Sequence, residues 1–185
     1  MNFNEHSDLA GLHAFLSPSN YHWLNYDEEK LIFTRQNFDA AKMGTRLHAF
    51  ACECILLGQK LPKNRKTLNM YVNDCIGYKM TPEQVLYFSE NCFGTADAIS
   101  FKRNTLRIFD YKSGSSPASM KQVEIYAAIF CLEYKIDPKD IDKMDLRIYQ
   151  NDEVLLSEPE PEEIIEICDH IIFCDKVLNK MEVEY

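Results

Sequence analysis

The chain has 185 residues, of which 46% are hydrophobic and 26% are charged, and its formal net charge at pH 7 is −9. This composition is typical of a globular chain and excludes a disordered one, and the negative charge argues against a surface that binds nucleic acid everywhere through its phosphates. No apolar run approaches the roughly 20 residues that cross a bilayer, and the first residues do not resemble a signal peptide, so we expect a cytoplasmic protein with no membrane partner.

The first predicted element is a short helix near the N-terminus. Ser17 is followed by Pro18, and this pair is a common helix start because serine caps the first turn and proline fits its first position. The helix should run through Trp23 and Leu24, with the tryptophan in the core.

A longer helix is predicted over residues 40–57, ended by Gly58. Its apolar side chains recur with the helical period of 3.6 residues; they are Met43, Leu47, Phe50, Ala51 and Cys54. Gly44 and His48 lie one turn apart on a neighbouring face. Because glycine inside a helix costs about 1 kcal/mol relative to alanine, we expect Gly44 to make room for a close neighbour beside His48.

Four basic residues come next, between two predicted helices: Lys60, Lys63, Arg65 and Lys66. They are either a solvated loop or a local track for nucleic acid. Further along, Thr81 and Pro82 repeat the combination of a capping residue and proline. This signal predicts a helix over residues 81–89.

A β-hairpin is predicted over residues 94–112, with its turn at Arg103 and Asn104. Residues that face each other across the hairpin then form two matched pairs, Ile99 with Ile108 and Asp97 with Asp110. Opposed side chains have Cβ atoms about 4.5 to 5.5 Å apart, so one cation could bind both carboxylates. Because strand residues alternate between faces, Lys112 points the same way as Asp110.

The remaining sequence predicts a loop over residues 113–117, a helix over 120–134, a strand over 145–150 and a long C-terminal helix that starts in the acidic segment 158–163. This order of elements indicates an α/β fold, with a small mixed β-sheet flanked by helices. We expect one domain over residues 1–185. It should have a helical part over residues 1–90 and an α/β core over 91–185 that packs against the helix over 40–57.

The carboxylates and the lysine of the hairpin suit metal-dependent chemistry. Mg²⁺ prefers oxygen ligands and keeps several waters. A bound cation lowers the pKa of a water ligand, which can then attack a phosphodiester in line. Lys112 could orient that water or neutralise the charge that develops on the phosphate. In the alternative interpretation Asp110 and Lys112 are surface residues and His48 is a core histidine.

Four segments are informative in combination: Gly44-Thr45-Arg46-Leu47-His48, Gly94-Thr95-Ala96-Asp97, Asp110-Tyr111-Lys112-Ser113-Gly114 and Gln122-Val123-Glu124-Ile125-Tyr126-Ala127. Together they resemble the RecB-like branch of the PD-(D/E)XK nuclease superfamily, and residues 13–19 with the following tryptophan resemble the opening of its phage-encoded members. The resemblance implies a restriction-endonuclease-like core. It also implies that Asp97 and Asp110 bind the metal, that Lys112 assists catalysis, and that His48 completes or flanks the metal site.

Seven cysteines in a chain without an export signal predict reduced thiols rather than disulfides. No Cys-x-x-Cys pair is present, so burial as small apolar residues is favoured over an iron–sulfur cluster. Many relatives in this nuclease branch carry such a cluster on one cysteine before the first helix and three near the C-terminus. Here Asn25 and Tyr26 stand where the first cysteine is often found and the C-terminal three are missing, so the cluster is not expected.

The resemblance further implies that Gln122 and Tyr126 position the substrate strand or brace Lys112. We therefore expect a deoxyribonuclease that uses Mg²⁺ or Mn²⁺, acting as an exonuclease in repair, phage recombination or nucleic-acid processing. The basic residues Lys60, Lys63, Arg65 and Lys66 would be further DNA contacts. So small a nuclease would ring DNA as a homo-oligomer or depend on a recombination or repair partner. The alternative is an inactive module that binds DNA ends or a protein partner, which the net charge favours and the intact acids disfavour.

Overall fold

The structure is a computed structural model of the chain, and it describes residues 14–183. The chain divides into two compact units, with the boundary between Met43 and Gly44. The helix α1 (Glu28–Leu57) runs across this boundary. Among the described helices, none combines the length and the hydropathy that are needed to cross a bilayer.

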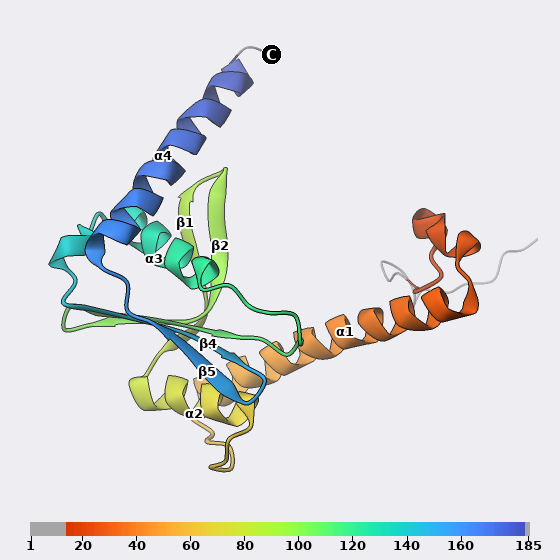
Figure 1. Cartoon of the computed structure of the whole chain (residues 1–185). Helices are drawn as coiled ribbons and strands as arrows, with labels where there is room; N and C mark the ends of the chain where they lie inside the picture. The colour runs from red at the N-terminus through yellow and green to blue at the C-terminus, as the bar shows by residue number, and fades with distance from the viewer. Residues whose placement is uncertain (1–13, 184–185) are drawn as a thin grey trace, which may run out of the picture. The chain divides into compact units, whose positions relative to one another are not determined.

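In the first unit, the described residues form η2 (Pro18–Asn25) and the first part of α1 (Figure 1). The predicted short helix is confirmed in position, although it is a 3-10 helix rather than an α-helix. Trp23 is half-buried rather than enclosed in a core. Its indole Nε1 donates a hydrogen bond to the backbone carbonyl of Ser17 over 3.1 Å, so the single tryptophan holds the start of this 3-10 helix.

The prediction that α1 starts at Ala40 is wrong, because the helix already starts at Glu28. The carboxylate of Asp27 accepts a hydrogen bond from the backbone N–H of Lys30 over 2.8 Å, which is the typical contact of a helix N-cap. Gly58 ends α1 as predicted, and its φ of +65° is the left-handed conformation that glycine adopts at little cost.

The second unit is built on a five-stranded sheet in the order β1-β2-β3-β4-β5. The strands are β1 (Thr81–Ser89), β2 (Cys92–Lys102), β3 (Thr105–Tyr111), β4 (Lys143–Gln150) and β5 (Glu153–Ser157). β3 and β4 are parallel and are connected through α3 (Lys121–Tyr134), while the other neighbours are antiparallel. The predicted α/β fold with a mixed sheet, and with a helical N-terminal part, is therefore confirmed.

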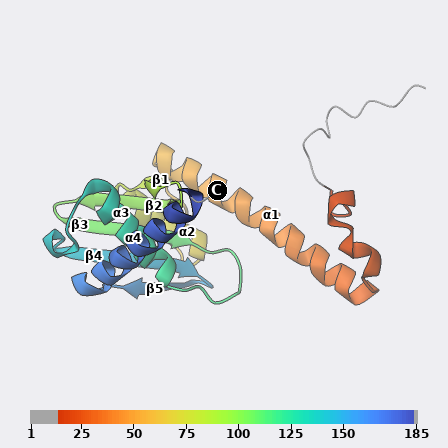
Figure 2. The ribbon, with the colours of Figure 1, turned by 90° about the horizontal axis from the view of Figure 1, so that it is seen from above.

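Helices cover both faces of this sheet (Figures 1 and 2). On one face, α3 and α4 (Pro161–Val183) enclose a core whose central members are Leu106, Ile108, Val123, Leu146 and Ile164. On the other face, α2 (Thr67–Tyr78) and the end of α1 enclose a second core, with Ala51, Val72, Phe109, Tyr111 and Tyr149. Alternate residues of β3 thus feed the two cores, as the period of a strand requires.

The predicted helix over residues 81–89 is wrong, because these residues form the strand β1. Burial alternates along β1 as it does in a strand with one covered face, and the strand pairs with β2 over most of its length. Three of its later residues are aromatic or β-branched, namely Val85, Tyr87 and Phe88, and such side chains favour strands. The predicted helical part over residues 1–90 therefore ends before β1.

The apolar stripe of α1 also differs from the prediction. Leu47, Ala51 and Cys54 pack in the core as expected, but Met43 and Phe50 are 52% and 43% exposed. The buried positions, which also include Ile55, lie on the side that faces α2 and the sheet.

The predicted hairpin is confirmed through its turn. Arg103 and Asn104 have φ angles of 49° and 51°, as in a two-residue hairpin turn of the I′ type. Ile99 stands opposite Ile108, as predicted, and the β2–β3 ladder ends at the pair Ala98 and Phe109.

The last part of the chain follows the prediction with one addition. The helix over residues 120–134, the strand over 145–150 and the long C-terminal helix correspond to α3, β4 and α4. The addition is β5, an exposed edge strand that follows a two-residue turn at Asn151 and Asp152, whose φ angles are 52° and 60°.

Candidate metal centre

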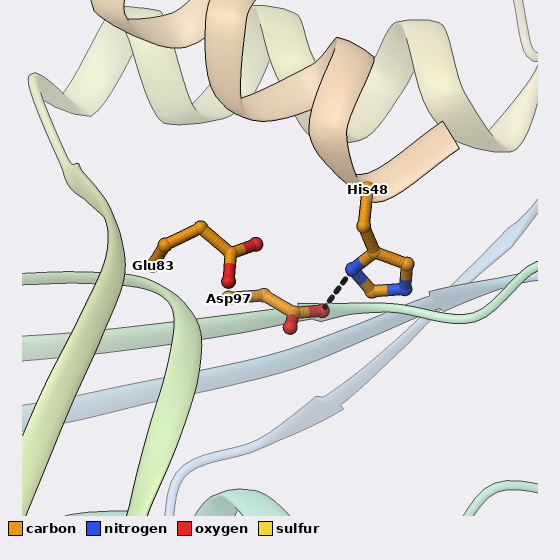
Figure 3. A group of neighbouring side chains, drawn as sticks. All are labelled: His48, Glu83 and Asp97. Carbon is orange, nitrogen blue, oxygen red and sulfur yellow. Dashed lines mark ion pairs between the residues drawn. The ribbon is translucent and has the colours of Figure 1, made fainter. Parts of the chain in front are cut away.

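Three side chains from three elements meet beside the sheet: His48 of α1, Glu83 of β1 and Asp97 of β2 (Figure 3). One ligand atom of each lies within 4.8 Å of the others. The His48 Nδ1 atom is 3.4 Å from the Asp97 Oδ2 atom. Within residues 14–183, this is the group of histidine and acidic side chains whose spacing fits a metal ion. We call these three residues the His48 cluster.

The backbone explains why Asp97 projects where it does. Counted from the hairpin turn, the last backbone pair of β2 and β3 is Ala98 with Phe109, and Asp97 is the next residue of β2 beyond it. From there the Asp97 carboxylate takes the place of the backbone, because its Oδ2 accepts a hydrogen bond from the backbone N–H of Tyr111 over 2.8 Å. This bond fixes one carboxylate oxygen at the end of β3, directly beside Asp110.

Glu83 owes its position to an irregularity in β1. Its φ of 49° lies in the left-handed region, which is uncommon for a residue other than glycine. Its neighbours Pro82 and Gln84 still pair with Ala98 and Ala96, so Glu83 stands opposite Asp97. Sequence reasoning missed Glu83 because the segment was interpreted as the first turn of a helix.

Asp110 lies at the end of β3 and is only 2% exposed. Its Oδ1 atom accepts hydrogen bonds from Lys112 Nζ over 3.1 Å and from Gln122 Nε2 over 3.0 Å. Its Oδ2 atom lies 2.9 Å from the same Nζ atom but accepts no hydrogen bond of good geometry. A buried carboxylate oxygen without a well-aligned donor is unusual, and its lone pairs are available to a cation.

The carboxylates of this region are electrostatically coupled. Burial and the nearby charge of Asp97 raise the pKa of Asp110 to about 6, against the opposing effect of Lys112 and His48. Partial desolvation, and then the charge of Asp97, raise the pKa of Glu83. The hydrogen bond to Asp97 raises the pKa of His48. Three acids whose negative charges disfavour one another form a region that a divalent cation would stabilise.

The predicted pair of Asp97 and Asp110 is thus brought to one end of β2 and β3, together with Lys112. The paired register of β2 and β3 agrees with the prediction as far as Ala98 and Phe109, and it ends one position before Asp97 and Asp110 would pair. Asp110 also lies outside the His48 cluster, whose third member is Glu83. The structure therefore groups Asp97 with His48 and Glu83, and Asp110 with Lys112 and Gln122.

Gln122 and Tyr126 lie on α3, one turn apart, and both support this end of the sheet. Gln122 braces Asp110 rather than Lys112. The Tyr126 hydroxyl donates a hydrogen bond to the Thr95 carbonyl over 2.7 Å. Gly94 permits this contact, because a Cβ atom there would lie 3.1 Å from the Tyr126 Cε1 atom. α3 therefore holds β2 just before Asp97.

The loop after Lys112 is held from two sides. A Cβ atom at Gly44 would lie 2.9 Å from the Ser113 Oγ atom, so the prediction that Gly44 makes room for a close neighbour is confirmed. The buried side chain of Gln150 donates to the carbonyls of Gly114 and Ser116 over 2.6 and 2.8 Å and accepts from the N–H of Ala118 over 3.2 Å. Sequence reasoning missed Gln150, because a glutamine that ends a strand carries no special pattern.

The four basic residues Lys60, Lys63, Arg65 and Lys66 are exposed on the loop between α1 and α2, and none belongs to the His48 cluster. Asn73 holds the loop through two hydrogen bonds with the backbone of Leu61, of 2.9 and 3.0 Å. Lys60 and Lys63 line a cavity of about 450 Å³. The loop is thus a fixed basic surface, which we call the basic loop (residues 58–66).

A second cavity opens at the His48 cluster. Its volume is about 560 Å³, and His48 and Glu83 form part of its wall. The other lining residues are Thr45, Ala49, Cys52, Glu53, Leu56 and Leu57, all on α1. His48 and Glu83 of the cluster are therefore open to this cavity.

All seven cysteines have free thiols, and none belongs to the candidate metal group found among residues 14–183. Cys52 and Cys54 differ in burial, as expected for positions on different faces of α1.

Comparison of the chain with family models, with curated proteins and with solved structures finds no match. The chemistry of the centre is therefore inferred from its own geometry.

Proposed function

We propose that this protein is a metal-dependent DNA nuclease of the RecB-like PD-(D/E)XK type, which hydrolyses phosphodiester bonds. The observation that carries the proposal is the end of β3, where buried Asp110 is paired with Lys112 and lies beside the fixed carboxylate of Asp97. Two acids and a lysine in this arrangement suit phosphoryl chemistry better than a structural role, because burial of a coupled carboxylate costs stability.

The donor atoms fit a divalent cation. Asp97 and Asp110 offer carboxylate oxygens, including the Asp110 Oδ2 atom, which accepts no hydrogen bond of good geometry, and His48 offers an imidazole nitrogen. Mg²⁺ and Mn²⁺ both accept carboxylate and water ligands. When bound, such a cation activates water as a nucleophile and neutralises charge on the phosphate.

The protein side chains supply the positioning. Gln122 and Lys112 hold the Asp110 carboxylate from two directions. The Lys112 side chain is 33% exposed, so its ammonium group reaches the surface and can contact a phosphate oxygen while it stays anchored to Asp110. In this role Lys112 acts as a point charge on the scissile phosphate.

The basic loop is a suitable second contact for the DNA backbone. It leads into α2, whose first residue, Thr67, binds the Asp152 carboxylate through its N–H and its hydroxyl over 2.8 and 2.9 Å. Asp152 follows β4, and the backbone N–H of Lys112 donates to the carbonyl of Tyr149 in the same strand over 2.9 Å. The basic loop and Lys112 therefore lie at the same end of the sheet, where a strand held at one can reach the other.

We further propose that the enzyme acts on free DNA ends in the cytoplasm, as an exonuclease of repair, phage recombination or nucleic-acid processing. The net charge of −9 makes DNA binding through the whole surface unfavourable. Additional contacts with the DNA duplex would come from a second copy of the chain or from a recombination or repair protein.

The test is an incubation of end-labelled linear DNA and closed circular DNA with the purified protein, with Mn²⁺ and with EDTA. Degradation of linear DNA alone, and only with Mn²⁺, supports the proposal. Asp110→Asn and Lys112→Ala should abolish it, whereas Lys143→Ala, which changes an exposed lysine paired with Glu158, should retain it. A parent protein that binds DNA ends without cleaving them in Mn²⁺ would establish the inactive alternative.

A further inference from the structure

We infer that Glu83 is a metal ligand, and that with His48 and Asp97 it forms a cation site of mixed nitrogen and oxygen donors suited to Mn²⁺ rather than Mg²⁺. The inference deepens the proposed function and rests on it through Asp97, which serves both the His48 cluster and the pair with Asp110.

The geometry of the three side chains supports a shared ligand. They come from α1, β1 and β2 and point toward one another (Figure 3), with ligand atoms within 4.8 Å. Two carboxylates this close repel unless a positive charge lies between them. His48 alone supplies at most one charge, and its Nδ1 atom is 3.4 Å from Asp97, so Glu83 is left without an ion pair of its own among the described residues.

An independent observation points to a cation at this end of the sheet. The Asp110 Oδ2 atom is buried and accepts no hydrogen bond of good geometry. Asp110 directly precedes Tyr111, whose backbone N–H donates a hydrogen bond to the Asp97 Oδ2 atom over 2.8 Å, so Asp110 lies at the end of the sheet where Asp97 of the cluster is held. Buried acceptors have hydrogen-bond donors in nearly all proteins, so the Asp110 Oδ2 atom is a further anionic acceptor at the same end of the sheet as Asp97, with lone pairs available to a cation.

The donor set indicates the kind of metal. Mg²⁺ prefers ligands that are all oxygen, whereas first-row transition metals accept imidazole together with carboxylates. The cluster offers one imidazole and two carboxylates. His48 and Glu83 line the cavity of about 560 Å³, so one side of the cluster is open to water or to a phosphate oxygen. A catalytic metal site needs such an open side, whereas a structural metal site is closed.

The inference is tested by titration of the full-length protein with Mn²⁺ in the absence of DNA, with the electron paramagnetic resonance signal of free Mn²⁺ as the readout. Glu83→Gln should weaken Mn²⁺ binding by at least about 10- to 100-fold, because a loss of that size already follows from a change in a residue that only supports a metal ligand. Glu83→Asn provides a second variant, since asparagine tolerates a positive φ. The matched control is Glu53→Gln, because Glu53 lines the same cavity outside the cluster, and it should bind Mn²⁺ like the parent.

Equal Mn²⁺ affinity of the parent and both Glu83 variants would overturn the inference, as would parent protein that binds Mg²⁺ as tightly as Mn²⁺. The two proposals fail separately. Mn²⁺ binding that depends on Glu83, in a protein that cleaves no DNA, would support the metal site and refute the nuclease. Cleavage with Mn²⁺ affinity independent of Glu83 would refute the metal site and leave the nuclease in place.

Discussion

Substitution of Asp110 by asparagine should make the metal-free protein more stable at neutral pH. Burial and the charge of Asp97 raise the pKa of Asp110 from 3.8 to about 6. Between these pH values the native state binds more protons than the unfolded chain, so stability falls as the pH rises from about 4 to about 6 and stays low above it. The difference in pKa corresponds to about 3 kcal/mol.

Asparagine removes the charge but does not reproduce every contact. Its Oδ1 atom can still accept from Gln122 and Lys112, whereas its amide nitrogen takes the position 2.9 Å from the Lys112 ammonium, with which it cannot bond. We therefore expect Asp110→Asn to raise the free energy of unfolding by about 1 to 3 kcal/mol at pH 7.5. At pH 4 the gain should be close to zero, because the native-state carboxyl of the parent is then neutral.

The assay is urea denaturation in EDTA, followed by far-ultraviolet circular dichroism at pH 4, 6 and 7.5. Asp145→Asn is the matched control, because Asp145 is equally buried but is paired with the Arg147 guanidinium over 2.7 and 2.9 Å. Breaking that pair should lower the free energy of unfolding by about 1 to 3 kcal/mol, because Arg147 keeps its contact with Asp74 over 3.3 Å. A variant Asp110→Asn that is no more stable than the parent at pH 7.5, or whose gain does not change with pH, would refute the reasoning.

Three further predictions concern the surroundings of the centre. Gly94→Val should displace the Tyr126 ring, because the ring would lie 3.1 Å from the new Cβ atom, and both the melting temperature and DNA cleavage should fall. Tyr126→Phe loses only the hydrogen bond to Thr95 and should lower the free energy of unfolding by about 1 kcal/mol. Gln150→Leu should speed amide hydrogen exchange in residues 113–118 and reduce kcat, whereas unchanged exchange would show that Gln150 does not hold the loop. Lys60→Ala with Lys63→Ala should weaken DNA binding and lower its salt dependence, and an unaltered salt slope would exclude the basic loop as a contact.

The hairpin could be predicted from the sequence because local rules determine it. A two-residue turn at Arg103 and Asn104 fixes the register of every pair before it, and alternation along β3 places Asp110 and Lys112 together. Ile99 and Ile108 confirm the register. Beyond the last backbone pair this rule no longer applies. There the Asp97 side chain, instead of a backbone carbonyl, accepts the hydrogen bond from the Tyr111 N–H, and no sequence pattern predicts such a contact.

β1 shows how a strong local signal can lose to tertiary structure. Thr81 and Pro82 form a good helix start, but pairing with β2 gives the backbone groups of this segment their hydrogen bonds. In the strand Leu86 is also almost fully buried, with only 1% of its surface exposed. This error also hid a residue of the candidate metal centre, because Glu83 belongs to this segment and becomes a neighbour of Asp97 only in the strand. His48, whose partner is distant in sequence, was recognisable through the family resemblance alone.

The most direct test of the central proposal is a crystal structure of the protein soaked with Mn²⁺, with anomalous diffraction to locate the metal. We predict an anomalous peak within coordination distance of the Asp97 carboxylate, at the end of β2 and β3. A fully ordered site at which Asp97 and Asp110 bind no metal, in crystals that hold Mn²⁺ elsewhere, would contradict it.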